Sequence, residues 1–335
     1  MLLSRHTKRR EFITLIGGAA TARPLAASAQ QNINLRHVSV MMTESETDQD
    51  AISRKEAFRQ ALQQLGWTDG RNLQLDFRWS LADPGRIRTV AAELAARAPD
   101  AVVASGAGLV APMLQASRTI PIVFVLVADP VGARIVDSLA HPGGNATGFT
   151  AVDYSFGSKW LELLKEIVPS VTRVGVLRDP NISVGIGLFD AIQSAAPSTG
   201  IEAVSISVGD AATIERNIAA FAHGPHDGLV VTTSPQVFAQ RDLIIASAAK
   251  LKLPAVYPAH PFVASGGLAA YHPNISEEYR LAAGYVDRIL KGTKPADLPV
   301  QNPTKYQLIV NLKTARALGI EVPAAVITRA DEVIE

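Results

Sequence analysis

The chain has 335 residues, of which 47% are hydrophobic and 19% charged, so it can bury a large core and is longer than one core usually serves. Lys and Arg number 32 and Asp and Glu 31, and the net charge of +1 predicts binding neither to nucleic acid nor to an anionic membrane surface. The absence of cysteine excludes disulfides, thiolate metal sites, a cysteine nucleophile and a lipid-modified cysteine.

The N-terminal segment 1–29 has the layout of an export signal. Arg9 and Arg10 stand directly before an apolar run, and Ala27-Ser28-Ala29 then offers an A-x-A cleavage site. The paired arginines favour the twin-arginine type, and the apolar run is only about half of the roughly 20 residues that span a bilayer. We therefore expect this segment to be removed and the mature chain to work in the periplasm, without a lipid anchor and without inserting into the membrane. A disordered basic N-terminus is the alternative interpretation.

Strands and helices are predicted to alternate along the chain that follows. Continuous apolar runs rich in β-branched residues at 100–105 and 120–127 are typical of strands buried on both faces of a parallel sheet. The predicted strands of this part are 35–42, 73–79, 100–105 and 120–127, and the predicted helices are 51–65, 84–98 and 109–117.

The same alternation starts again after the turn Pro142-Gly143-Gly144-Asn145. Two successive runs of strand and helix indicate two doubly wound α/β lobes rather than one continuous sheet. The predicted strands of the second run are 173–177, 201–208, 228–232 and 254–257, and its predicted helices are 158–167, 188–196, 211–222 and 240–251.

Six segments, in order along the chain, carry a resemblance to a known family. They are GWTDGRNLQLDFRW (66–79), TIPIVFVLVADPV (119–131), SLAHPGGNATGFT (138–150), SGGLAAY (265–271), ILKGTKPADLPVQNPTKYQLIVNLKTARALG (289–319) and RADEVIE (329–335). With the export signal, they resemble the substrate-binding proteins of ABC-type importers, in the family that includes tryptophan- and phenylalanine-binding members. The family often has Gly after the tyrosine of GGLxxYG, whereas His272 stands here, so we expect that loop to line the ligand site differently.

The resemblance implies a type I periplasmic-binding-protein fold, in which two Rossmann-like, doubly wound lobes are joined by a three-strand hinge and close over a ligand. The hinge crossings are expected near 147–151, near 256–261 and after 297. The first lobe would then comprise 33–147 and 261–297, including Gly266-Gly267, and the second 148–258 and part of 298–335.

The carboxyl ends of the strands predict the ligand site independently of the resemblance, because helix N-termini present free N–H groups there. For an amino acid, the Ser105 hydroxyl and the amides of Gly106 and Ala107 are candidates to hold the carboxylate. Glu44 or Asp129 is a candidate to accept from the ammonium group.

Other side chains complete this predicted site, and Tyr154, Phe149 or Tyr257 is expected to cover an apolar ligand side chain. Loop or helix capping is the alternative role for each polar residue. The full set of candidates is Thr43, Glu44, Ser45, Ser105, Gly106, Ala107, Asp129, Phe149, Tyr154, Asp179, Asn181, Thr232, Ser234 and Tyr257.

One enzyme motif competes with this interpretation. The segment 106–111 fits G-x-G-x-x-A between a strand and a helix, and Asp129 lies about 20 residues further on, where a ribose-binding acid is expected. Against dinucleotide binding, the motif follows the third strand of its lobe rather than the first, and Pro112 is expected to shorten the helix. Because the motif itself is present, an exported NAD-binding oxidoreductase is kept as an alternative.

Other catalytic or metal-binding patterns are weaker. The strand-turn-helix pattern G-x-S-x-G fails at Ser105 because Val103 stands two residues before it. The seven histidines show no metal-ligand spacing. We expect no cofactor and no metal.

The sequence as a whole predicts a monomeric, non-enzymatic periplasmic receptor. It would bind a small molecule, either an amino acid or an aromatic acid, and deliver it to an inner-membrane ABC permease. A ligand-binding component of a sensory receptor with the same fold is a second alternative.

Overall fold

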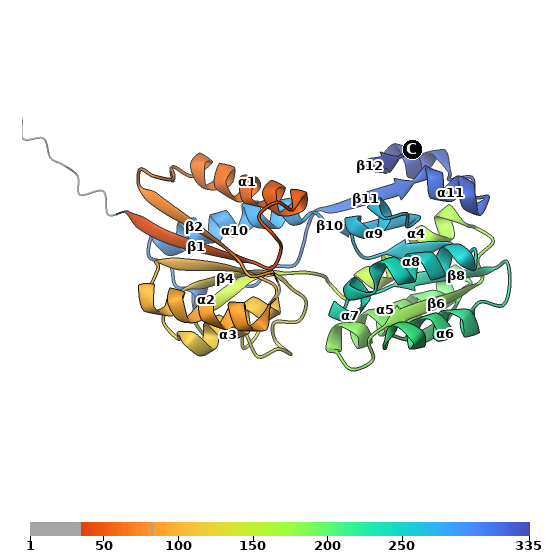
Figure 1. Cartoon of the computed structure of the whole chain (residues 1–335), viewed down its shortest axis with the longest axis horizontal. Helices are drawn as coiled ribbons and strands as arrows, with labels where there is room; N and C mark the ends of the chain where they lie inside the picture. The colour runs from red at the N-terminus through yellow and green to blue at the C-terminus, as the bar shows by residue number, and fades with distance from the viewer. Residues whose placement is uncertain (1–34, 82) are drawn as a thin grey trace, which may run out of the picture. The chain divides into compact units, whose positions relative to one another are not determined.

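The computed structural model describes residues 35–81 and 83–335, which form two α/β lobes, each built on its own sheet (Figure 1). The predicted export signal lies outside the described residues. The first sheet is entirely parallel, with strand order β2-β1-β3-β4-β5. Its strands are β1 (Arg36–Met42), β2 (Leu73–Trp79), β3 (Ala101–Ser105), β4 (Ile122–Val127) and β5 (Ala146–Thr150).

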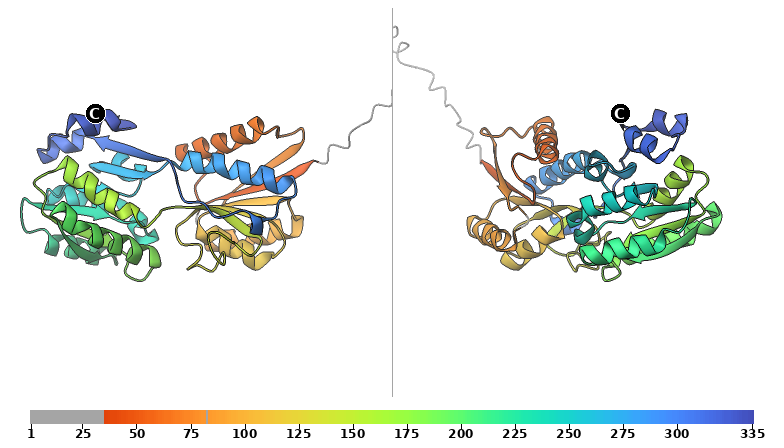
Figure 2. Two further views of the ribbon diagram at one scale, coloured as in Figure 1. Left: turned by 180° about the vertical axis from the view of Figure 1, so that it is seen from behind. Right: turned by 45° about the vertical axis from the view of Figure 1, so that its right-hand side comes forward.

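Helices cover both faces of the first sheet, so its central strands are buried on both sides. Val103 and Val125 pack in one core with α1 (Gln49–Gln64) and α10 (Ile275–Leu290), which lie side by side in Figure 2. Val102 and Phe124 point to the opposite core, with α2 (Pro84–Arg97) and α3 (Ala107–Ala116). The expectation of doubly buried strands is therefore confirmed for β3 and β4.

The second lobe has a mixed sheet with strand order β12-β11-β10-β9-β8-β6-β7. All neighbouring strands pair in parallel except β10 and β11, which run antiparallel. The strands are β6 (Arg173–Arg178), β7 (Glu202–Ser207), β8 (Asp227–Val231), β9 (Ala255–Tyr257), β10 (Ala269–Pro273), β11 (Tyr306–Asn311) and β12 (Glu332–Ile334).

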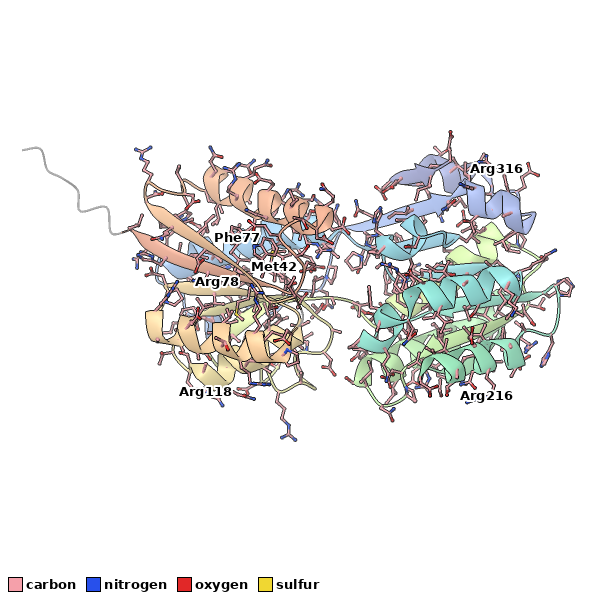
Figure 3. The ribbon with its side chains drawn as sticks, in the orientation of Figure 1. Met42, Phe77, Arg78, Arg118, Arg216 and Arg316 are labelled. Carbon is pink, nitrogen blue, oxygen red and sulfur yellow. The ribbon has the colours of Figure 1, made fainter. Side chains whose placement is uncertain are left out.

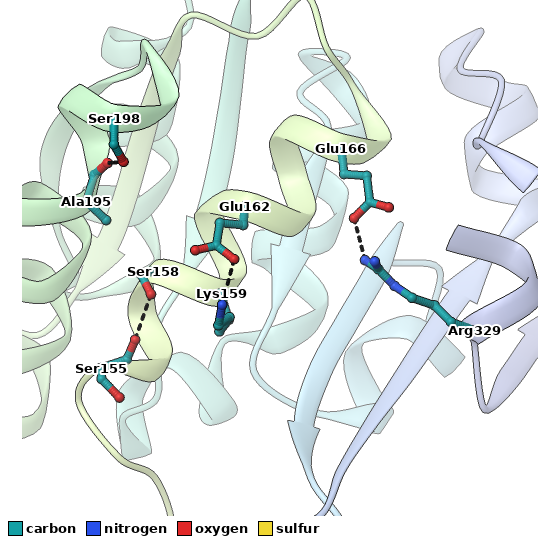
Figure 4. Close-up of polar contacts among 8 residues, drawn as sticks. All are labelled: Ser155, Ser158, Lys159, Glu162, Glu166, Ala195, Ser198 and Arg329. Atoms are coloured by element: carbon teal, nitrogen blue, oxygen red, sulfur yellow. Dashed lines mark hydrogen bonds and ion pairs between the residues drawn. The ribbon is translucent and has the colours of Figure 1, made fainter. Parts of the chain in front are cut away.

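Two helical layers also enclose the second sheet. One core gathers α4 and α5 with the C-terminal α11 and α12, and the other gathers α6, α8 and α9. Arg329 of α12 pairs with Glu166 of α4 and so ties the C-terminal helix to the first of these layers (Figure 4). The helices are α4 (Phe156–Ile167), α5 (Ser183–Thr199), α6 (Ala211–Phe221), α7 (Pro235–Ala239), α8 (Arg241–Lys250), α9 (His260–Ala264), α11 (Leu312–Leu318) and α12 (Ala324–Arg329).

The sequence order of the elements makes the chain cross between the lobes three times. It leaves the first sheet after β5, returns between β10 and α10, and leaves again after the short helix η1 (Pro295–Asp297) to form β11. Asn302 joins the first and third crossings, because its amide nitrogen donates to Asp153 over 2.9 Å and its oxygen accepts from the Thr150 hydroxyl over 2.8 Å. The backbone N–H of Asn274 donates to the Lys305 carbonyl over 2.9 Å and joins the second crossing to the third.

One predicted boundary is wrong. The segment 261–273, including Gly266-Gly267, was expected in the first lobe, but β10 pairs with β9 and β11 in the second sheet. The chain crosses at Pro273-Asn274 rather than near 256–261. The reason is that β9 is a buried strand inside the sheet and another apolar strand follows it before the chain leaves the lobe.

A smaller correction concerns Pro112. It was expected to shorten the helix, yet α3 continues through it to Ala116.

Within the described residues, none of the helices is both long and apolar enough to cross a membrane.

The tightest backbone approach in the first lobe lies next to the first crossing. Gly148 in β5 has a φ of 154°, and a Cβ built on it would stand 1.9 Å from the Phe124 carbonyl oxygen. We predict that Gly148→Ala lowers the free energy of unfolding by at least about 2 kcal/mol, because both the φ angle and the clash oppose a side chain. Urea unfolding monitored by circular dichroism measures the effect.

Gly144→Ala is the matched control. Gly144 lies four residues away, and a Cβ built on it meets no atom within 4 Å. A change within about 0.5 kcal/mol is expected for this variant. Equal stabilities of the two variants would contradict the argument.

Candidate functional site

The carboxyl ends of the strands bring the predicted first-lobe residues to one edge. β1, β3 and β4 are neighbours in the sheet, so the loops after Met42, Ser105 and Val127 lie at the same side of it. Figure 3 labels Met42, the last residue of β1. Glu44 and Ser105 stand at these ends, where the chain leaves the sheet. Two small hollows of the described residues lie elsewhere: one is lined by Trp67 and Leu75, the other by Leu253 and Tyr257. The candidate site is therefore defined by the strand ends.

Unpartnered polar atoms mark the same regions. A buried donor or acceptor without a hydrogen bond costs about 1–3 kcal/mol, so such groups are few in folded proteins and call for a specific explanation. In the described chain they belong to five side chains, all near strand ends or crossings. The atoms are the Tyr154 hydroxyl, Arg178 Nη1, His272 Nε2, Glu278 Oε1 and Oε2, and the Tyr279 hydroxyl.

Glu278 is the most unusual member of this set. Its side chain projects from the first turn of α10, and the residue is 2% exposed. Burial raises the pKa of Glu278 to about 8, although the backbone amide of Leu126 and the Arg54 guanidinium oppose that shift. The carboxyl group is therefore neutral at pH 7 in the free protein.

The surroundings of Glu278 are polar. Arg54 of α1 binds Glu44 with Nη1 2.5 Å from Oε1, and this pair is largely shielded from solvent. The Tyr279 hydroxyl lies within reach of Ser105, although burial is the main reason that the pKa of Tyr279 is raised. Leu126 adopts a φ of 58° where the pairing of β4 with β5 shifts register. These residues form the first-lobe polar cluster: Glu44, Arg54, Ser105, Glu278 and Tyr279.

A second group joins the lobes. Burial alone would raise the pKa of Asp129, but the Ser183 hydroxyl, the Gly132 amide and the Tyr154 hydroxyl outweigh burial and hold it below its usual value. The Gly132 amide donates to Asp129 Oδ1 over 2.8 Å. Ser183 belongs to α5 of the second lobe and Tyr154 to the first crossing, so Asp129 faces both. The Tyr154 hydroxyl makes no hydrogen bond of good geometry.

Most predicted residues of the second lobe have capping or bridging roles. Asp179 Oδ1 accepts from the Asn181 amide over 2.9 Å, and the Ser234 hydroxyl accepts from the Val237 amide at the start of α7. The Thr232 hydroxyl donates to the Leu177 carbonyl, and Thr232 is fully buried. In the first lobe, Thr43 donates to Glu44, and Ser45 contacts Thr47. The capping alternative therefore describes Asp179 and Ser234.

Three expectations about ligand contact find no support. Phe149 packs in the core against Tyr285, with ring centroids 4.8 Å apart, because β5 is buried on both faces. Tyr257 is 2% exposed and stacks on Phe262 inside the second lobe. The Gly106 amide donates to the Val125 carbonyl over 2.8 Å and is not free to bind a carboxylate.

The predicted site residues do not include Arg54, Glu278 or Tyr279, and His272 was noted only as a departure from the family's GGLxxYG motif. The prediction was limited to loops that follow strands, whereas Arg54, Glu278 and Tyr279 lie on helices and His272 within β10. One signal was available: Glu278 and Ala282 are four residues apart on the buried side of α10, where most of the other residues are apolar. A charged residue on such a stripe indicates a special environment.

Aromatic side chains also gather where the crossings enter the second lobe. Phe156 stacks on Tyr306 with ring centroids 4.3 Å apart and on Tyr271 at 4.9 Å. The Trp160 indole donates to the Tyr271 carbonyl over 2.6 Å. Burial is the main cause that raises the pKa of Tyr306 to about 12, with Glu278 among the smaller contributions. Tyr306 therefore lies near enough to the first-lobe polar cluster to sense its charge.

Metal and dinucleotide sites have little structural basis in the described residues. Within residues 35–81 and 83–335, no three His, Cys, Asp or Glu side chains gather closely enough to hold a metal ion. The segment 106–111 does form a strand-to-helix turn, but Asp129 is already engaged by Gly132 and faces Ser183.

Comparison with known proteins decides the family. The family model described as "ABC transporter substrate binding protein" matches residues 38–334. The chain belongs to this family. It is a family of substrate-binding proteins and not of enzymes, which favours binding over the oxidoreductase alternative.

Relatives and solved structures agree with this assignment. A tyrosine-binding protein of Clostridioides difficile is 26% identical over 80% of this chain and 76% of its own. A conserved domain protein from Vibrio cholerae is 27% identical and matches with a TM-score of 0.75 over 90% of this chain and 99% of its own. A Streptococcus pneumonia domain in complex with L-Trp is 24% identical and matches with a TM-score of 0.76 over 90% and 100%. The predicted type I periplasmic-binding-protein fold is confirmed.

The neutral state of Glu278 can be tested through stability. Folding raises the pKa of the Glu278 carboxyl group. The contribution of this group to the free energy of unfolding is therefore complete below pH 4.5, its pKa in the unfolded chain, and is lost as the pH rises through about 8, its pKa in the folded protein. We predict that Glu278→Gln matches the unchanged protein at pH 5 but melts at least about 2 °C higher at pH 8.5. Thermal melts across this pH range measure the difference.

The neighbouring Glu277→Gln provides a control of opposite sign. A hydrogen bond from Lys305 is the largest cause that lowers the pKa of Glu277. The Glu277 carboxylate therefore stabilises the folded protein at pH values above 4.5, its pKa in the unfolded chain, and this stabilisation is lost on acidification. Glu277→Gln is expected to lower the melting temperature at pH 7 and above. A pH-independent melting difference for Glu278→Gln would contradict a buried neutral acid.

Proposed function

We propose that this chain is the periplasmic solute-binding receptor of an ABC importer. It binds an amino acid or an aromatic acid between its two lobes and delivers it to an inner-membrane permease, without chemical change of the solute. The single observation that carries the proposal is the set of unpartnered polar atoms near the strand ends and crossings of a chain that belongs to a substrate-binding family. The paired arginines of the N-terminal segment support export.

The chemistry of the site suits a zwitterion with an aromatic or apolar side chain. The first-lobe polar cluster offers carboxyl and hydroxyl groups, and Arg178 at the end of β6 keeps one guanidinium nitrogen without a partner. Micromolar affinity corresponds to about 8 kcal/mol, which a few charged hydrogen bonds and one buried side chain supply after ordering costs. The tyrosine-binding and L-Trp-bound relatives support the same class of ligand.

Ligand binding would shift the population toward closed lobes, because the ligand contacts both lobes only in that form. Asp129, Tyr154 and Ser183 supply a polar link between the lobes that closure can strengthen. Large apolar side chains also stay exposed at the same edges, where a permease can cover them. They are Ile52, Leu81 and Val131 on the first lobe, and Ile186 and Phe238 on the second.

The ligand class is tested by thermal shift with L-tyrosine, L-tryptophan and L-phenylalanine. A ligand at 100 times its Kd adds about 2.7 kcal/mol of stability, a shift of several degrees. At least one of the three is expected to raise the melting temperature. An unchanged melting temperature with all three would show that the proposed ligand class is wrong.

The link between the lobes is tested with Asp129→Asn. Hydrogen bonds to a charged group contribute about 1.5–3 kcal/mol, so we predict at least a tenfold loss of affinity for the amino acid that binds. Asp190→Asn, on an exposed position of α5, is the matched control and should bind normally. Calorimetric titration measures both, and wild-type affinity of Asp129→Asn would refute a role for Asp129 in closure.

A further inference from the structure

The first-lobe polar cluster contains one carboxyl group that no residue of the described chain satisfies. Both oxygens of Glu278 are buried and have no hydrogen bond of good geometry. The other carboxylates proposed for an ammonium group are already occupied: Glu44 binds Arg54 at 2.5 Å, and Asp129 accepts from the Gly132 amide. Glu278 is therefore the acceptor with the greatest unused capacity.

The backbone around Glu278 is arranged at some cost. Leu126 is held at a φ of 58°, a left-handed conformation that is unfavourable for a leucine, where β4 shifts register against β5. The Leu126 amide thereby lies near the Glu278 carboxyl group. Glu278 also stands in the first turn of α10, where free N–H groups favour an anion. Both features stabilise an ionised carboxylate, yet burial keeps the Glu278 carboxyl group protonated in the ligand-free protein.

The charges that face this group come from several elements. Arg54 of α1 and Glu44 after β1 form an ion pair whose charges cancel. Tyr279 of α10 and Tyr306 of β11 stay neutral at physiological pH, since burial raises the pKa of each. His272 of β10 lies within electrostatic range of Arg54, Asp50 and His260, and burial is the main cause that lowers the pKa of His272, so the ring is neutral at pH 7. With Glu278 protonated, the set carries no positive excess that would repel a cation.

We propose that Glu278 accepts the amino group of the ligand and releases its proton to solvent when the ligand's ammonium binds. The step exchanges one proton for one cation: a carboxylic acid and an ammonium ion become a carboxylate–ammonium pair, and a proton leaves to the buffer. The inference rests on the proposed function and deepens it, because it makes the receptor selective for α-amino acids over acids that lack the amino group. The pairing also gives both buried oxygens of Glu278 their missing partners.

The experiment is calorimetric titration of the mature chain with L-tyrosine and L-tryptophan. The des-amino analogues 3-(4-hydroxyphenyl)propanoate and 3-indolepropanoate serve as probes without an amino group. Titrations at pH 6.5 and 7.5, in two buffers of different ionisation enthalpy, give the number of protons released. We expect release of nearly one proton at pH 7, and a Kd that falls close to tenfold between the two pH values.

Variants separate Glu278 from the rest of the protein. Glu278→Gln keeps the shape of the neutral acid and is expected to fold, to bind the amino acids at least tenfold more weakly, and to release no proton. Glu215→Gln, an exposed glutamate on α6, is the matched control and should behave as the unchanged chain. The des-amino analogues are expected to bind weakly and with no dependence on residue 278.

The outcomes distinguish this inference from the function on which it rests. Binding of an amino acid without proton release, unchanged affinity of Glu278→Gln, or equally tight binding of a des-amino analogue would each overturn the role of Glu278 and leave the receptor function standing. Failure of both the amino acids and their analogues to bind would overturn the proposed ligand class, and the role of Glu278 with it.

Discussion

Parallel strands that are buried on both faces dominate this structure. β3 and β4 carry only apolar or small side chains into two cores, so no charged group is tolerated along their length. Polar chemistry is confined to the points where the strands end and helices begin. Ser105, Asp129 and Arg178 all stand at such points, in different parts of the chain. The place of the proposed binding site is therefore a consequence of how the cores are built.

The three crossings connect the two lobes. Asn302 holds the first and third crossings together through Asp153 and Thr150, and the Asn274 amide holds the second to the third. These links are hydrogen bonds between short connecting segments. Such links hold the three crossings to one another, and short connecting segments are where a hinge can absorb a change in backbone angle.

A protein that leaves polar atoms unpaired in its interior gives up stability that it can recover on binding. Glu278 shows the principle most clearly, because the positive end of α10 and the Leu126 amide surround a carboxyl group that is nevertheless neutral. The environment already contains what the ionised form needs except a cation. In the proposed mode of binding, binding energy and selectivity come from the same contact, since only a ligand that carries the cation completes the site.

The sequence alone predicts the export signal, the alternation of strands and helices, and the existence of two lobes, because hydrophobic periodicity and turn residues are local properties. The predicted strands 73–79 and 173–177 agree with β2 and β6 within a residue. Tertiary structure alone decided that β10 joins the second sheet and that α10 returns to the first, because strand pairing joins residues far apart in the chain. It likewise brought Glu278 beside Leu126 and Arg54, and removed Phe149 and Tyr257 from the surface. Burial and proximity set the chemistry of those side chains, and neither can be calculated from residue type and local spacing.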